Sequence, residues 1–203
     1  MVLPDDIKEQ VKERLADMQD KVKIVFSENP SAPLNDEIKN LLQEVAELSD
    51  KIEFETAPDV FDMKPAFEIK GKNKGRIIFA GIPSGHEFAT LLEDLIMASK
   101  GDSQLSDSTK EFLAGLTDKL QLKVFVTPTC PYCPRAVFLA HRMAMESDKV
   151  EGVMVEATEF PEESQKFSVS GVPHTIVNNK QGGFVGAHPE QSAVEEIKKA
   201  LGQ

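Results

Sequence analysis

Apolar residues recur along the first part of the chain with two different periods. Spacings of three or four residues predict an entry helix within 5–20 and a second helix around 38–48. Between and after them, the β-rich run 21–26 and the alternating run 51–56 predict strands. The pattern therefore indicates a mixed α/β chain from its beginning.

A hairpin and two further helices follow in the pattern. Two short apolar runs within 64–81 flank a turn rich in Gly, Asn and Lys, which is typical of two antiparallel strands. Ser84 stands three residues before Glu87 ahead of an apolar run, the spacing of a capping box, so we expect a helix to begin there. A further helix is predicted over 107–118.

The same order of elements then begins again about 100 residues later. The matching segments are 23–26 with 123–126, 65–69 with 173–177, and 79–81 with 184–186. Each half reads strand, helix, strand, an optional short helix, hairpin, helix. We therefore predict an α/β fold of two tandem units, 1–105 and 106–203, each a four-stranded mixed sheet with helices on both faces.

Composition and charge narrow the class of protein. The chain has 203 residues, of which 40% are hydrophobic and 28% charged, enough for two small globular domains. A net charge of −11 disfavours nucleic acids and anionic membranes as partners. The N-terminus lacks the pattern of a signal peptide and no stretch approaches about 18 consecutive apolar residues, so we expect a cytoplasmic protein.

Cys130 and Cys133 are the only cysteines, and they stand between a predicted strand and a predicted helix. The positive end of a helix favours a thiolate, so we expect Cys130 to be exposed and nucleophilic. Cys133, one turn into the helix, would then resolve the mixed disulfide. We assign Pro131 and Tyr132 to the substrate-binding surface, with no chemical role for Tyr132.

Two other roles for the pair compete with redox chemistry. A structural disulfide is disfavoured in a reducing cytosol. A zinc site needs about four ligands, and the chain offers no second cysteine pair. His141 lies eight residues beyond Cys133, too far to share an ion, while His174 could approach. We expect no metal and no cofactor other than a redox-active disulfide, with an iron–sulfur cluster shared between two chains left open.

Val172 and Pro173 precede the third strand of the second unit. In a fold of this order that loop packs against the cysteine pair, and a cis proline would present the backbone of Val172 to an extended substrate segment. The alternative is that Pro173 merely begins an edge strand, where proline is tolerated. Val172 and Pro173 are therefore candidate substrate-binding residues.

These motifs resemble known families. The sequence Cys-Pro-Tyr-Cys is the typical active-site motif of glutaredoxins, and with 171–173 and Gly186 it resembles a thioredoxin-fold unit. The stretches 124–137, 171–177 and 81–96 resemble the two-thioredoxin-fold protein disulfide oxidoreductases of archaea and thermophilic bacteria. The stretch 81–96 is also similar to the N-terminal domain of the alkyl hydroperoxide reductase flavoprotein.

The resemblance covers nearly the whole chain and implies roles for individual residues. It makes Cys130 the nucleophile, Cys133 the resolving cysteine and Pro173 the cis proline. Family members often carry a buried acid where Glu156 stands, so Glu156 is a candidate proton shuttle, with a solvent-facing strand carboxylate as the alternative. Val124 occupies the place of the buried aspartate of thioredoxins, so the thioredoxin proton route is absent.

The first unit has no cysteine where the motif would fall. Alignment from the strand places Pro30 opposite Cys130, and alignment from the helix places 32–35 opposite the motif. The first unit is therefore predicted to be redox-inactive. The hydroperoxide reductase domain shows the same asymmetry, with a single pair in its second unit.

We expect a thiol–disulfide oxidoreductase that reduces, forms or isomerises disulfides of protein substrates, with a thioredoxin-reductase-type flavoprotein as electron donor. One alternative is a dedicated dithiol electron carrier between a flavoprotein reductase and a peroxidase-type partner. Another is a non-catalytic binding module that uses a groove around Lys64 and Pro65. The sequence leaves the physiological direction and the use of glutathione open.

Overall fold

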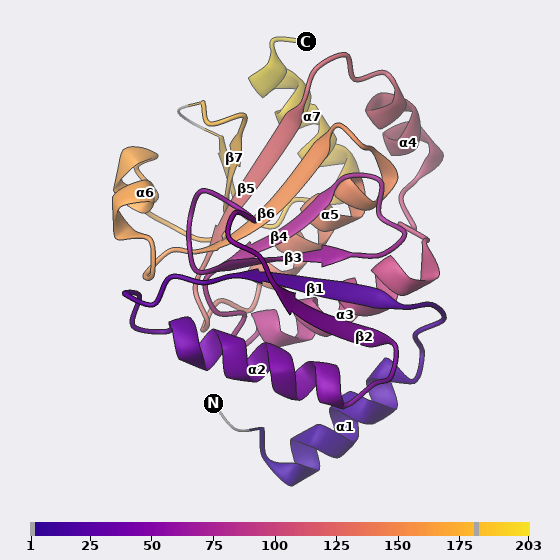
Figure 1. The fold of residues 1–203 in the computed structure, drawn as a ribbon. Helices are drawn as coiled ribbons and strands as arrows, with labels where there is room; N and C mark the ends of the chain where they lie inside the picture. The colour runs from indigo at the N-terminus through magenta and orange to yellow at the C-terminus, as the bar shows by residue number, and fades with distance from the viewer. Residues whose placement is uncertain (1–2, 181–182) are drawn as a thin grey trace.

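The computed structural model describes residues 3–180 and 183–203, and its strands form one eight-stranded sheet (Figure 1). The elements of the first half are α1 (Asp5–Leu15), β1 (Val22–Ser27), α2 (Asn35–Glu47), β2 (Ile52–Thr56), β3 (Ala66–Lys70), β4 (Arg76–Ala80) and α3 (Glu87–Lys100). Those of the second half are α4 (Asp107–Ala114), β5 (Leu120–Val126), α5 (Cys133–Glu146), β6 (Val150–Glu156), α6 (Pro161–Lys166), β7 (His174–Val177), β8 (Phe184–Val185) and α7 (Glu190–Leu201).

Strand pairing repeats between the halves. In the first, β1 is parallel to β2 and antiparallel to β3, and β3 and β4 form a hairpin. In the second, β5 is parallel to β6 and antiparallel to β7, and β7 and β8 form a hairpin. The predicted fold class, α/β with two four-stranded mixed sheets, is confirmed.

The two sheets are joined edge to edge, which the sequence pattern did not predict. Strand β4 pairs in parallel with β6, from Arg76 opposite Glu151 to Ala80 opposite Val155. The resulting strand order is β2-β1-β3-β4-β6-β5-β7-β8. The domain boundary between residues 105 and 106 stays a prediction.

The sheet has a thick and a thin covering layer. One face carries the larger core, which receives apolar side chains from α1, α2, α3, α5 and α7. The other face carries a smaller core, where Phe125 and Ile176 of the second unit pack near Phe167, which follows α6. In the first unit the segment 57–65, through Phe61 and Met63, packs against this smaller core at the place that α6 takes in the second unit.

The end of the sheet that carries the cysteine pair is assembled from both units. Strands β4, β5 and β6 run parallel, so α3 and α5 begin at the same edge, and the two helices pack together. The His86 N–H donates to the Pro128 carbonyl oxygen at 3.2 Å. Gly85 has a φ of +59°, and a Cβ there would collide with the same carbonyl. The first unit thus packs directly against the loop that leads to Cys130.

Within the described ranges, no helix is both long enough and apolar enough to cross a membrane.

Candidate redox site

Cys130 and Cys133 form a disulfide at the start of α5, with their Cα atoms 5.5 Å apart. The Cys133 N–H points at Cys130 Sγ, with the nitrogen 3.2 Å from the sulfur. The side chain of Cys133 is fully buried. Cys130 is only 8% exposed, so the expectation of an exposed Cys130 is wrong for the disulfide form. A helix amide aimed at the outer sulfur stabilises negative charge there when the disulfide opens.

The loop before β7 lies against the outer sulfur. The Val172–Pro173 peptide is cis, and the Val172 carbonyl oxygen is 3.8 Å from Cys130 Sγ. The Pro173 carbonyl accepts a hydrogen bond of 2.8 Å from the Gly186 N–H. Since β7 pairs with both β5 and β8, Pro173 does not begin an edge strand. The backbone of Val172 therefore borders the disulfide.

Exposed apolar side chains lie beside the disulfide. Tyr132 is 63% exposed and Val185 53%, and they are the exposed large hydrophobic residues of the described chain. Pro131 is also exposed. Val185 pairs with His174, the residue after Pro173, so it reaches the same end of the sheet. Exposed aromatic and aliphatic side chains next to a reactive disulfide are typical of a docking surface for another protein.

Glu156 ends β6 and is 2% exposed, so the solvent-facing alternative for it is wrong. Its Oε2 accepts hydrogen bonds of 2.7 Å from Thr158 Oγ1 and from the Glu159 N–H, while Oε1 has no hydrogen-bond partner among the described residues. Neither cysteine is among these partners. Its role as a proton shuttle stays a prediction.

Glu159, which the sequence analysis missed, joins the two units beside Glu156. Its Oε1 accepts a hydrogen bond of 2.6 Å from the Ile82 N–H. Burial raises the pKa of Glu159 to about 7; the Ile82 N–H opposes the shift, and the negative charges of Glu156 and Glu37 add to it. The sequence signal that could have identified Glu159 is its position three residues after Glu156, which places a second carboxylate near the first.

A buried polar cluster lies between α3 and α5. Asp94 and His141 are fully buried, with Asp94 Oδ2 2.5 Å from His141 Nδ1. Glu87 is 1% exposed and accepts a hydrogen bond of 2.8 Å from Thr90 Oγ1. Burial raises the pKa of Glu87 to about 7 and also raises the pKa of Asp94. Each unit thus contributes polar groups to the interface behind the cysteine pair.

Two expectations from the sequence concern residues of this cluster. A helix does begin at Glu87, but the predicted capping box is wrong, because α3 has no side-chain cap and the Glu87 side chain is buried. His141, expected to lie too far along its helix to share an ion with the cysteines, pairs with Asp94. The signal missed was the spacing of Glu87 and Asp94, seven residues apart on the face of α3 that also carries Leu91.

The equivalent junction of the first unit is arranged differently. Helix α2 begins at Asn35 as α5 begins at Cys133, which places Ala32 opposite Cys130. The Lys64–Pro65 peptide is cis as well, but the Lys64 carbonyl accepts a hydrogen bond of 3.2 Å from Asn29 Nδ2. The side chain of Lys64 is also engaged, with Asp59 at 2.9 Å. This junction has no thiol, and both the carbonyl and the ammonium group of Lys64 are already paired within the first unit.

Among residues 3–180 and 183–203, no group of three or more His, Cys, Asp or Glu side chains is placed to hold a metal ion. The two sulfur atoms are the redox-active groups of the site. An opened Cys130–Cys133 pair can take up or give up two electrons by thiol–disulfide exchange.

Known proteins resemble both the second unit and the whole chain. The family described as thioredoxin domain matches residues 120–199. The alkyl hydroperoxide reductase protein AhpF of Escherichia coli K12 is 30% identical over 211 residues, covering 98% of this chain and 40% of that protein. The corresponding protein of Staphylococcus epidermidis ATCC 12228 is 29% identical, covering 90% of this chain and 35% of that protein. The chain therefore spans less than half the length of these relatives.

Solved structures share the complete arrangement. A protein disulfide oxidoreductase from Aeropyrum pernix superposes with a TM-score of 0.87 at 26% identity, covering 98% of this chain and 94% of that one. The C503A mutant of the alkylhydroperoxide reductase protein AhpF from Enterococcus faecalis gives a TM-score of 0.86 at 26% identity, covering 97% and 100%. Together with the Cys130–Cys133 disulfide at the start of α5, these likenesses show that the chain is built from two thioredoxin-fold units, the second of which carries the cysteine pair.

Proposed function

We propose that the protein exchanges electron pairs with disulfides of other proteins through Cys130 and Cys133 alone. The observation that carries this proposal is the position of Cys130 Sγ, 3.2 Å from the Cys133 backbone nitrogen and bordered by exposed apolar side chains. The helix amide favours the thiolate form of Cys130, and the apolar surface receives the partner.

The exchange balances as two sulfur displacements. The Cys130 thiolate attacks one sulfur of a substrate disulfide, forms a mixed disulfide and releases the other substrate sulfur as a thiolate. Cys133, once deprotonated, attacks Cys130 Sγ, closes the Cys130–Cys133 disulfide and releases the second substrate thiolate. The substrate gains two electrons, the protein loses two, and the released thiolates take up protons. Disulfide formation is the same sequence in reverse.

The substrate-binding residues of this proposal surround the outer sulfur. The Val172 backbone, next to Pro173, pairs with an extended substrate segment, and Pro131 and Tyr132 line the approach. We assign Glu156 to proton transfer during resolution, supported by its burial at the end of the strand next to β5. Protein disulfides are the proposed substrates, and a reducing cytoplasm is the proposed setting.

A second candidate function is a dedicated electron carrier. It is supported by the likeness to AhpF of alkyl hydroperoxide reductase, because this chain covers 40% of the Escherichia coli protein and resembles it over nearly its own whole length. In this role a thioredoxin-reductase-type flavoprotein would reduce the Cys130–Cys133 disulfide, and a peroxidase-type protein would reoxidise the dithiol.

Two assays separate these functions. In the first, the dithiothreitol-reduced protein is mixed with insulin, and the insulin thiols released are counted. A general oxidoreductase reduces insulin at a rate that depends on Cys130, whereas a dedicated carrier reduces a peroxidase disulfide and leaves insulin oxidised. In the second, the oxidised protein is offered glutathione or NADPH with a thioredoxin reductase. Reduction by glutathione alone would contradict the flavoprotein as donor.

The binding-module alternative receives no support from the first unit. The Lys64 carbonyl, which would have to receive a peptide, is bonded to Asn29, and the Lys64 ammonium to Asp59. If Cys130→Ser left the biological activity intact, the redox proposal would be wrong and a binding role would replace it.

A further inference from the structure

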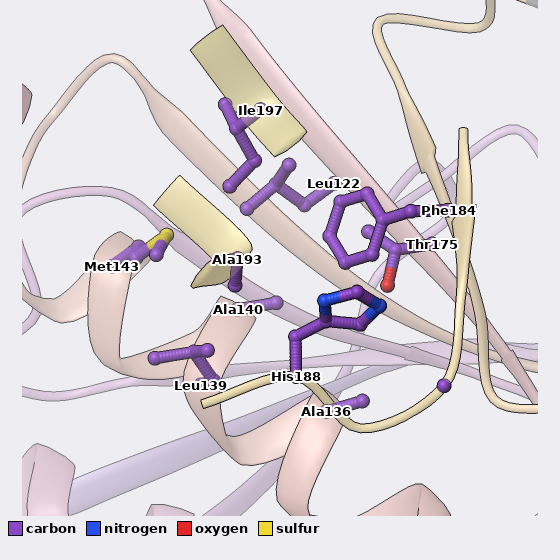
Figure 2. A pocket seen from close by; sticks show the side chains of 11 residues that line it. Leu122, Ala136, Leu139, Ala140, Met143, Thr175, Phe184, His188, Ala193 and Ile197 are labelled. Carbon is purple, nitrogen blue, oxygen red and sulfur yellow. The ribbon is translucent and has the colours of Figure 1, made fainter. Parts of the chain in front are cut away.

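Lys123 in β5 carries a buried positive charge on the face of the sheet with the thin covering layer. Leu122 of β5 and Thr175 of β7 point to the other face, toward α5 and α7 (Figure 2). Since side chains alternate along a strand, Lys123 and its β7 partner Ile176 point to the thin layer, where Ile176 belongs to the smaller core. Only 8% of the Lys123 side chain is exposed. The strand that leads to Cys130 therefore holds an ammonium group inside this layer.

Groups from both units surround the ammonium group of Lys123. Its Nζ is 3.0 Å from Glu163 Oε1 on α6. The same nitrogen lies 5.7 Å from the ring centre of Phe167, which follows α6, and 5.8 Å from that of Phe61 in the first unit. An ammonium group at this distance is attracted to the face of an aromatic ring. Lys123 therefore connects β5 with α6 and with the segment 57–65.

Phe167 links this contact to the substrate-binding loop. Val169 and Val172 pack against the smaller core, to which Phe167 belongs. The turn after Phe167 closes back on α6, because the Val169 N–H donates to the Ser164 carbonyl at 2.9 Å. A shift of α6 is therefore passed on to the loop that ends at Val172. The carbonyl oxygen of Val172 lies 3.8 Å from Cys130 Sγ.

The first unit has an equivalent lysine, but that lysine lies at the surface. Lys23 aligns with Lys123 in the internal repeat, and its Nζ is 3.0 Å from Glu55 Oε2. The two side chains are 39% and 49% exposed, and surface pairs of this kind constrain a structure little. A buried ion pair need not add stability over apolar residues of the same size, so we expect its effect in the geometry that it fixes. Only the unit with the cysteine pair buries this lysine.

We propose that Lys123 is a positioning residue for the binding of protein substrates. By holding α6 and Phe167, it keeps the Val172 backbone where an extended substrate segment can pair with it while the substrate disulfide reaches Cys130. The first unit takes part in this positioning through Phe61. The inference rests on the proposed function, because it concerns the binding of protein disulfides beside Val172.

The test compares a protein disulfide, which can pair with the Val172 backbone, with a small disulfide, which cannot. Turnover of insulin with dithiothreitol as reductant gives kcat and KM. A single turnover of dithiodipyridine by the reduced full-length protein gives the reactivity of Cys130. We expect Lys123→Met to raise the KM for insulin about tenfold, because a displaced positioning group weakens binding. The kcat for insulin should change less than about threefold and the rate with dithiodipyridine less than about twofold.

Three further variants connect the change in KM with the charge and its contacts. Lys123→Met keeps the length of the side chain, and Glu163 keeps Lys166 at 3.0 Å. Lys123→Arg retains the charge and should return the KM to within about threefold of the parent. Lys23→Met is the matched control in the first unit and should leave the KM within about twofold. Phe61→Leu removes one aromatic face and should raise the KM about two- to threefold.

The outcomes separate this inference from the proposed function. If the parent protein does not reduce insulin, the proposed function is wrong and the inference falls with it. If insulin is reduced but Lys123→Met keeps the parent KM, or loses the same factor on both disulfides, the positioning role is wrong. An equal rise of KM in Lys23→Met, or no recovery in Lys123→Arg, would also overturn it. If Lys123→Met does not fold, as judged by circular dichroism, the KM of Phe61→Leu decides the matter.

Discussion

The loops before α2 and α5 occupy equivalent places in the two units, yet different atoms fill them. In the second unit, Cys130 Sγ faces the Val172 carbonyl at 3.8 Å across a surface with exposed apolar residues. In the first, the Asn29 carboxamide bonds the Lys64 carbonyl, and Ala32 stands where the nucleophile would be. The same backbone arrangement therefore gives a reactive site where a sulfur atom faces the carbonyl before the cis proline. It gives an unreactive site where a side-chain amide donates a hydrogen bond to that carbonyl.

The first unit nevertheless takes part in the site through the interface. Asp94 on α3 pairs with His141 on α5, and Ile82 after β4 donates to Glu159 after β6. Both contacts connect elements that flank the cysteine loop. We therefore expect the second unit to carry out the thiol–disulfide exchange and the first unit to hold α5 and the neighbouring loops in place.

The largest expected effect is the loss of exchange in Cys130→Ser. A hydroxyl at this position is not ionised at neutral pH and cannot displace sulfur, so turnover of a protein disulfide should fall more than about 1000-fold. Ala32→Ser, the matched change in the first unit, should leave the rate within about twofold of the parent. A large loss in Ala32→Ser would break the comparison between the units.

Removing the charge of Asp94 should cost the most stability. Asp94→Asn leaves His141 buried with a weaker partner, and we expect the free energy of unfolding in urea to fall by about 2–4 kcal/mol. Glu93→Gln is the control, because Glu93 pairs with Arg14 at the surface, where such pairs contribute at most about 1 kcal/mol. Equal losses in the two variants would show that the buried Asp94–His141 pair contributes no more to stability than a surface ion pair.

The pH dependence of stability should report the carboxyl of Glu159. Its pKa is about 7 in the folded protein and near 4.5 when unfolded, so the folded state holds the extra proton between these values. Stability from this group is therefore greatest below about pH 4.5 and is lost as the pH rises to about 7. Glu159→Gln should remove the part of the slope that Glu159 contributes, while the part from Glu87, whose pKa is also about 7, remains. Because the side chain of Glu159 is partly exposed, the substitution should add about 1–2 kcal/mol at about pH 8. A urea series across this pH range that shows the same slope in both proteins would contradict this.

The smallest effect is expected at Glu156. The equivalent residue at the end of β2 is the exposed Thr56, so only the second unit buries an acid there. Glu156→Gln keeps a hydrogen-bond acceptor for Thr158 but removes the carboxylate that would accept the proton in this proposal. We expect the resolution step to slow by about three- to tenfold, with a flatter pH profile, in stopped-flow measurements. An unchanged profile would leave Glu156 a structural residue and take proton transfer out of its role.

Much of this arrangement could be read from the chain because it is local. The internal repeat, the hairpins and the position of the cysteine pair before a helix depend on period, turn residues and short spacing. The edge pairing of β4 with β6 could not be read, because apolar periodicity specifies which face of a strand is buried and not which strand lies beside it. The same limit hid Glu159 and the Asp94–His141 pair, whose partners lie far away in sequence.

The capping box failed for a related reason. Ser84 and Glu87 have the spacing of a capping box. The loop around Gly85 instead packs against Pro128, and the buried Glu87 side chain accepts a hydrogen bond from Thr90. Tertiary contacts outweighed a local signal worth about 1 kcal/mol. For Glu156 the local signal was also misleading, because strand alternation allowed a solvent-facing side chain. The family resemblance implied the burial that the structure shows.

The most direct test of the central claim counts thiols on the protein during turnover. Reduced protein is mixed with a stoichiometric protein disulfide, quenched with an alkylating agent and analysed by mass spectrometry. We expect Cys130 and Cys133 to be oxidised together as substrate thiols appear, and Cys133→Ser to accumulate a mixed disulfide on Cys130. Substrate reduction with both cysteines still alkylated, or equal turnover by Cys130→Ser, would contradict it.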